Sequence, residues 1–258
     1  MYLQLRAESF NLFNHTQFTG ISAAQTIGTS DYAALQTRVE RRMANGFTVQ
    51  AAYTWSKTMT ESGFLNSFDQ QLERVIGPFD RTHVFVTSGI VELPFGRTRH
   101  WGRNWNGVVD TLLGGWQVSY LFRSQSGAPL GFGNFIFQEG ATINDVTLPG
   151  SERSERRWFN GDAFDRSTAR QLVSNVRTQP TRFSEVRGPG YAVLDLAVMK
   201  NVSIGPRMRL QLRGEIYNTL NRANLRGPNT APTNSAFGTI TAQNGLPRQL
   251  QLAARLSF

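Results

Sequence analysis

Residues 47–57 read Phe-Thr-Val-Gln-Ala-Ala-Tyr-Thr-Trp-Ser-Lys and alternate with a period of two. Successive side chains of a β-strand point to opposite faces of the sheet. One face of this stretch would therefore carry Phe47, Val49, Ala51, Tyr53 and Trp55, and the other face would be mostly polar. This alternation predicts a strand with one apolar face.

The same alternation returns further along the chain. It is clear in residues 116–123, 208–216 and 250–258, and less regular in residues 2–10, 34–43, 83–93 and 191–203. We therefore expect about eight strands of about ten residues, which is the length of a tilted strand that crosses a membrane.

The connections between these strands sort by length. Tight turns are indicated at Asn45-Gly46 and Gly205-Pro206, and the 94–113 connection is intermediate, whereas 58–82, 125–190 and 218–247 are long. If the strands run alternately up and down, the short turns meet at one end and the long loops at the other. The sequence thus predicts an all-β protein, an antiparallel up-and-down meander that forms a transmembrane β-barrel or a curved segment of one. A soluble sandwich has no reason to sort its loops in this way.

The composition is compatible with such a barrel. The chain has 258 residues with 24 glycines and no cysteine, and its mean hydropathy is −0.33. No apolar run approaches the roughly 20 residues of a membrane helix. The formal net charge is +9, and all but two of the 27 basic residues are arginine. An arginine-rich nucleic-acid-binding β protein is therefore an alternative, although arginines along strands and loops that face water or lipid head groups explain the same charge.

The alternation also assigns side chains to the two faces. We expect an aromatic girdle in contact with lipid, made of Tyr53, Trp55, Trp116, Tyr120, Phe122 and Phe258. A ligand-stacking platform is the alternative for the five of these residues that precede Phe258. The polar side chains predicted to face the lumen are Arg209, Arg213, Glu215 and Arg255. Trp101 and Trp105 are expected as anchors at the periplasmic rim.

No catalytic, cofactor or metal site is predicted. The chain lacks a Gly-x-Ser-x-Gly elbow, so a triad of Ser88, His83 and Asp80 is disfavoured against a structural histidine. The glycine-rich stretch 127–133 lacks the Lys-Ser/Thr of a phosphate loop. Asp162 and Asp165 are expected to form solvated ion pairs rather than a calcium site.

One repeat links the two ends of the chain. Residues 1–14 align with residues 208–221, with eight of the fourteen positions identical. We interpret residues 1–20 as a duplicate of the penultimate strand and the start of its loop. This interpretation predicts that residues 1–10 pair with residues 249–258 and close a small barrel.

A set of short motifs from residue 32 to the end resembles one family. The stretches are Tyr32-Ala-Ala-Leu-Gln-Thr-Arg-Val-Glu-Arg-Arg, Tyr53-Thr-Trp-Ser-Lys, Asp80-Arg-Thr-His, Leu93-Pro-Phe-Gly, Gly115-Trp, Ser126-Gly, Arg157-Trp-Phe-Asn, Gly188-Pro-Gly, Asp195-Leu, Arg213-Gly-Glu-Ile-Tyr-Asn and Pro247-Arg-Gln-Leu-Gln, before the terminal Phe258. Together they resemble the C-terminal part of the barrel of TonB-dependent outer-membrane receptors, specifically the Oar-like group.

The resemblance implies nutrient uptake across the outer membrane of a Gram-negative-type bacterium, without enzymatic activity or a cofactor. It implies as partners outer-membrane lipid, the barrel-assembly machinery acting on Phe258, and TonB-type energy coupling only if a plug lies upstream; it implies no nucleic acid. Such barrels have about 22 strands, so we expect residues 1–258 to be a single partial barrel domain without a plug, a truncated piece. An inactive barrel remnant with a structural role is the alternative.

Overall fold

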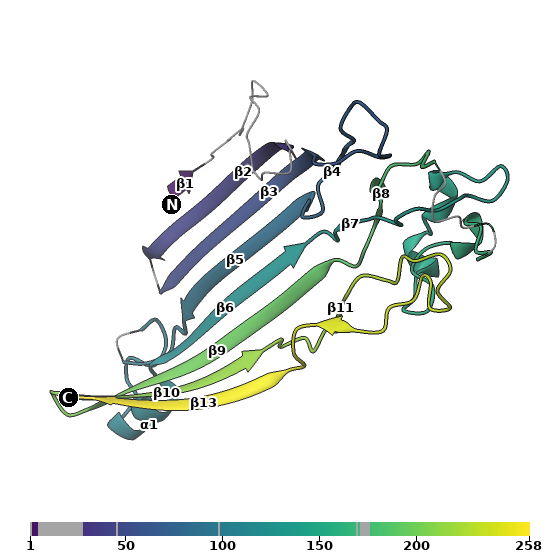
Figure 1. Cartoon of the computed structure of the whole chain (residues 1–258). Coiled ribbons are helices and arrows are strands. Elements are labelled where there is room, and N and C mark those ends of the chain that lie inside the picture. The colour runs from purple at the N-terminus through teal and green to yellow at the C-terminus, as the bar shows by residue number, and fades with distance from the viewer. Residues whose placement is uncertain (1, 5–27, 45, 98, 169, 171–175) are drawn as a thin grey trace.

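The computed structural model describes residues 2–4, 28–44, 46–97, 99–168, 170 and 176–258. Its main element is one nine-stranded antiparallel sheet, which Figure 1 shows as a broad curved surface. The strands in spatial order are β1 (Tyr2–Gln4), β2 (Thr29–Ala44), β3 (Phe47–Glu61), β5 (His83–Glu92), β6 (Trp116–Gln125), β9 (Tyr191–Ile204), β10 (Met208–Tyr217) and β13 (Gln249–Ser257), while β4 (Arg74–Ile76) pairs with the end of β3.

The predicted meander is confirmed, because each strand of this path pairs with the next one along the chain. The strand bounds agree closely with the alternation, except that β2 and β3 extend beyond the predicted residues 34–43 and 47–57. Their extra length is one continuous hairpin, in which Thr29 pairs with Glu61 at the far end. The predicted strand at 2–10 is described only at Tyr2–Gln4, and its remaining residues lie outside the described part of the chain.

The predicted closure of the sheet is wrong for the residues that the structure describes. Tyr2–Gln4 pair with Arg38–Glu40 of β2, and among described residues β13 pairs with β10 alone. In Figure 1, β1 and β13 lie at opposite margins of the sheet. The interpretation of residues 1–20 as a duplicate of the penultimate strand region stays a prediction, and the described residues form an open segment of sheet.

The connections sort to opposite ends of the sheet, as predicted. The turns after β2 and β9 lie at one end, together with the 93–115 connection that holds helix α1 (Gly107–Leu113). Gly46 and Gly205 occupy these turns with φ values of 77° and 67°, which L-residues with a side chain rarely adopt. The three long connections lie at the other end (Figure 1).

The long connections build a compact lobe, which we call the loop lobe (the described residues of 126–190 and 218–248). It contains the short pairs β7 (Pro129–Leu130) with β8 (Phe183–Arg187) and β11 (Asn224–Leu225) with β12 (Gln243–Asn244), and the 3₁₀ turns η1 (Ile143–Val146), η2 (Gly150–Glu152) and η3 (Gly161–Ala163). Its centre is a cluster of buried phenylalanines, Phe132, Phe135, Phe159, Phe164, Phe183 and Phe237. The apolar core of the described chain therefore lies in the loops, where period-two analysis of strands could not detect it.

No helix in the described residues is long and apolar enough to span a membrane.

Candidate ligand site on the polar face of the sheet

The strand register divides the predicted site residues between two faces. Residues that pair directly across an antiparallel ladder point to the same side. The pairs Trp116–Lys200, Tyr120–Leu196 and Phe122–Leu194 join β6 to β9, and the rows continue through β5 to Tyr53 and Trp55 of β3. Tyr53, Trp55, Trp116, Tyr120 and Phe122 therefore share one side with Leu210, Leu212, Leu250, Leu252 and Leu256, and we call this side the apolar face.

The opposite side, which we call the polar face, carries Arg209, Arg213, Glu215 and Arg255. Arg255 is placed there by its pairing with Gln211. Arg213 forms an ion pair with Glu215, and the Tyr217 hydroxyl donates to the same carboxylate at 3.0 Å. The division of these residues between two faces follows from the sequence, while lipid or lumen contact by either face stays a prediction. Phe258 lies one residue beyond β13 and is 96% exposed.

 Two adjoining hollows, of about 310 and 430 Å³, lie on the polar face near the loop lobe. A third hollow, of about 540 Å³, lies on the apolar face. The two polar hollows share Arg123, Tyr191, Asn244 and Gly245, and together we call them the polar hollow.

The floor of the polar hollow is formed by the sheet and its roof by the 218–248 connection. Arg123 pairs across the ladder with Val193, and Gln125 with Tyr191, so these side chains rise from the same face. Asn244 of β12 reaches the hollow from above. Arg123 is exposed, and its guanidinium makes no hydrogen bond or ion pair with any residue that the structure describes. An unengaged guanidinium beside tyrosine and amide groups is suited to bind a polar solute.

Two asparagines hold the roof in place. The side chain of Asn224 accepts from Ala192 N at 2.8 Å and donates to Ala192 O at 3.0 Å, as a backbone partner would. Asn218 N donates to Asp195 Oδ1 at 2.8 Å, and Asn218 Nδ2 donates to Leu246 O at 3.2 Å. The roof is thus fastened to β9 by buried hydrogen bonds, and the hollow does not depend on a loose loop.

The asparagines of the repeat have a conformational explanation. Asn218 and Asn221 both have φ 48°, the left-handed region that asparagine tolerates better than other non-glycine residues. Asn221 N donates to Asn218 O at 2.7 Å, which closes the turn after β10. The spacing of these two asparagines therefore encodes the end of a strand and a turn.

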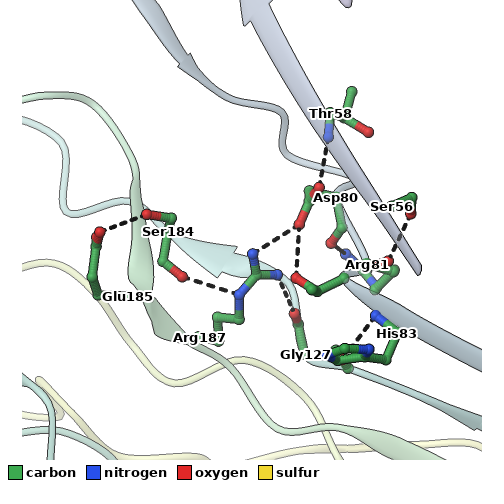
Figure 2. Close-up of polar contacts among 11 residues, drawn as sticks. Ser56, Thr58, Asp80, Arg81, His83, Gly127, Ser184, Glu185 and Arg187 are labelled. Carbon is green, nitrogen blue, oxygen red and sulfur yellow. Dashed lines mark hydrogen bonds and ion pairs between the residues drawn. The ribbon is translucent and has the colours of Figure 1, made fainter. Parts of the chain in front are cut away.

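A buried ion pair fastens the loop lobe to the sheet at a second point (Figure 2). Asp80 is 1% exposed and accepts from Arg187 Nη2 of β8 at 2.8 Å and from Thr58 N of β3 at 2.7 Å. Arg187 also donates to Gly127 O and Ser184 O. Burial, followed by the nearby charge of Arg187, lowers the pKa of Arg81, while the charge of Asp80 acts in the opposite direction.

The side chains considered for a hydrolase triad are engaged elsewhere. His83 Nδ1 is 2.8 Å from the Tyr53 hydroxyl, and the two rings stack. Asp80 is held by Thr58 and Arg187. Ser88 lies on the polar face, opposite Gln50, whereas His83 lies on the apolar face, opposite Trp55. These three side chains therefore do not converge.

The other chemistry-bearing stretches have structural partners. The glycine-rich stretch 127–133 contributes Leu130 and Phe132 to the core of the loop lobe. Asp162 forms an exposed ion pair with Arg157 at 3.8 Å, as expected. Asp165 pairs with Arg170 but is only 6% exposed, so the expectation of a solvated pair is wrong for this residue because the lobe covers it. No three His, Asp or Glu side chains among the described residues gather as metal ligands.

Trp101 and Trp105 lie in the connection at the short-turn end, where the sequence placed them. Trp101 bridges to Phe95, and the two rings are 5.4 Å apart. Trp101 is 53% exposed. The interfacial role of this pair stays a prediction.

An antiparallel meander with one apolar and one polar face, short turns at one end and long loops at the other, defines the class of outer-membrane β-barrel proteins. The chain belongs to the outer membrane beta barrel domain family, whose model matches residues 17–251. Its location is accordingly the outer membrane. No curated protein and no solved structure matches the chain.

Proposed function

We propose that this chain is the barrel part of an outer-membrane receptor and transporter of the TonB-dependent type, which takes up a polar nutrient. The observation that carries the proposal is the polar hollow, in which the free guanidinium of Arg123 meets Tyr191 and Asn244 beneath a fastened loop. The hollow lies toward the long-loop end, where outer-membrane barrels receive solutes from outside. In this proposal the polar face lines the lumen, and the apolar face with its aromatic girdle contacts lipid.

The described segment is a part of the wall of such a barrel. A TonB-dependent barrel of about 22 strands encloses a plug. The edge of β13 that no described residue pairs with is available for a further strand. Energy coupling would require a plug supplied by sequence outside the described residues. Phe258, exposed beyond β13, is proposed as the contact for the barrel-assembly machinery. Neither enzymatic activity nor nucleic-acid binding is part of the proposal.

Uptake measurements test this function. Cells that produce the full-length protein, its deletion mutant and variants are compared for energy-dependent accumulation of labelled metal chelates, oligosaccharides and peptides. We expect the deletion to abolish uptake of one solute class. The double variant Arg123→Ala with Tyr191→Ala should lower that uptake about tenfold, which corresponds to a loss of about 1.4 kcal/mol of binding free energy. Arg156→Ala, on the exposed surface of the loop lobe, is the matched control. The proposal is wrong if the protein is in the outer membrane and no solute distinguishes the deletion from the wild type.

A further inference from the structure

The third hollow, of about 540 Å³, lies on the apolar face across β6, β9, β10 and β13. It is formed by two neighbouring rows of the ladder. One row runs through Trp116, Lys200, Leu212 and Ala254, and the next runs through Val198, Gly214 and Leu252. The small residues Gly214 and Ala254 leave space between larger neighbours. We call this site the Lys200 hollow.

Lys200 is the unusual member of these rows, because it is a charged residue that is only 6% exposed and lines the hollow among mostly apolar side chains. Its Nζ donates to Gly114 O and lies 5.4 Å from the centre of the Trp116 ring. No ion pair of the described residues includes Lys200. The charge of Asp110 acts on it from beyond ion-pair distance, and the Asp110 carboxylate accepts from Arg97 N. A cation beside hydrocarbon is costly without an anionic partner.

With the apolar face against lipid, as proposed above, the position of Lys200 along the strand places it at a membrane boundary. Lys200 lies four residues before the end of β9 at the short-turn end, and Trp116 is the first residue of β6. The Gly214 row lies one step further from the short turns, and thus deeper in the bilayer. The ammonium is therefore at the level of lipid head groups, and the empty space over Gly214 is at the level of acyl chains.

We propose that the Lys200 hollow binds one anionic glycerophospholipid of the periplasmic leaflet. Its phosphate pairs with the Lys200 ammonium, and one acyl chain lies over Gly214 between Leu212 and Leu252. The volume is within the range of small-molecule sites, and the single fixed cation is complementary to a single phosphate charge. This inference rests on the proposed contact between the apolar face and lipid.

The proposal is tested with substitutions whose side chains occupy the Lys200 hollow. A Cβ at Gly214 would meet only Leu252 Cδ2, at 3.5 Å, which is an ordinary contact. Gly214→Leu should therefore be accommodated while its side chain occupies the acyl space. The full-length protein and its variants are placed in nanodiscs of phosphatidylglycerol and phosphatidylethanolamine, and retained lipid is counted by native mass spectrometry. We expect about a tenfold fall in the fraction with one bound phosphatidylglycerol, equivalent to about 1.4 kcal/mol.

Two further variants and one control sharpen the result. Ala254→Leu enters the same hollow from β13 and decides the matter if Gly214→Leu does not assemble. Lys200→Gln should keep a bound lipid but lose the preference for phosphatidylglycerol over phosphatidylethanolamine. Ala51→Leu, on the apolar face in β3 and outside the hollow, should retain lipid as the wild type does. Equal retention by the wild type, Gly214→Leu and Ala254→Leu would overturn the proposal.

A result that disproves lipid binding in the Lys200 hollow can be told apart from a result that disproves the proposed uptake function. Lipid retention does not require solute uptake, so a protein without uptake can still show the Gly214→Leu effect. The orientation of the apolar face is read separately from the quenching of tryptophan fluorescence by brominated acyl chains, since Trp55 and Trp116 both lie on that face. Quenching without specific retention would remove the site and leave the orientation intact.

Discussion

At the scale of single residues, Asn221 shows why a turn needs a particular side chain. Its φ of 48° costs an ordinary L-residue about 1–2 kcal/mol, and its Oδ1 accepts from Arg248 N at 3.1 Å. We expect Asn221→Ala to lower the free energy of unfolding by about 1–2 kcal/mol, because the strain is then uncompensated. Asn221→Gly relieves the strain and should cost less, as measured by denaturant titration in lipid vesicles. Equal losses for the two variants would contradict the conformational explanation.

Leu252 tests the assignment of the two faces. It pairs with Gly214 on the apolar face, and its neighbour Gln251 pairs with Glu215 on the polar face. Leu252→Arg should lower the free energy of unfolding in lipid by about 2–4 kcal/mol, the cost of a cation near the middle of the bilayer. Gln251→Arg, one residue away, should be close to neutral because it faces water and Glu215. A neutral Leu252→Arg would count against lipid contact by the apolar face.

At the scale of elements, the Asp80–Arg187 pair joins β8 of the loop lobe to the sheet. Asp80→Asn leaves the Arg187 guanidinium without its carboxylate partner. We expect the free energy of unfolding to fall by an amount near the lower end of the range of about 3–5 kcal/mol. Faster hydrogen exchange in β8 and in residues 127–130 would report the loosened lobe. Asp162→Asn, which breaks the exposed pair with Arg157, should cost less than about 1 kcal/mol. If β8 and residues 127–130 show the same rates of hydrogen exchange in both variants, the buried pair does not anchor the lobe.

The η1 turn should respond to acid. The backbone N–H and then the hydroxyl of Thr142 donate to Asp145, and they lower the pKa of its carboxyl below the usual 3.8. A carboxyl whose pKa is lower in the folded state stabilises the fold above its unfolded pKa, and this contribution is lost as the pH falls through the folded value. Protection of residues 143–146 against hydrogen exchange, corrected for intrinsic rates, should therefore decrease below about pH 4. In the Asp145→Asn variant, residues 143–146 should be less protected against hydrogen exchange at neutral pH, and their protection should not decrease further below about pH 4.

At the scale of the whole molecule, the open sheet predicts which strands can be linked. The chain has no cysteine, so any disulfide that forms in a variant must join the two engineered cysteines. Cysteines at Leu210 and Leu256, which pair across β10 and β13, should form a disulfide in outer membranes. Cysteines at Gln4 and at any of residues 252–256 should not, because β1 and β13 lie at opposite margins of the described sheet. A disulfide between Gln4 and β13 would restore the closed barrel.

Much of the sheet was predictable because a strand reports its two faces through alternation. Trp116, Val118, Tyr120 and Phe122 alternate with polar or smaller residues, and this local pattern indicated both the strand and its apolar side. The polar hollow was not predictable in the same way. Arg123 and Asn244 are 121 residues apart, and they meet only because the 218–248 connection folds back over the sheet.

The sequence by itself determined the antiparallel meander, the faces of its strands and the ends at which its loops lie, since period-two patterning and turn residues act over a few neighbours. Only the tertiary structure decided that β13 pairs with β10 alone among the described residues, that the phenylalanine core lies in the loop lobe, and that Asp80 meets Arg187. These contacts join residues far apart in the chain, and their formation depends on loop closure and packing, which no local pattern encodes.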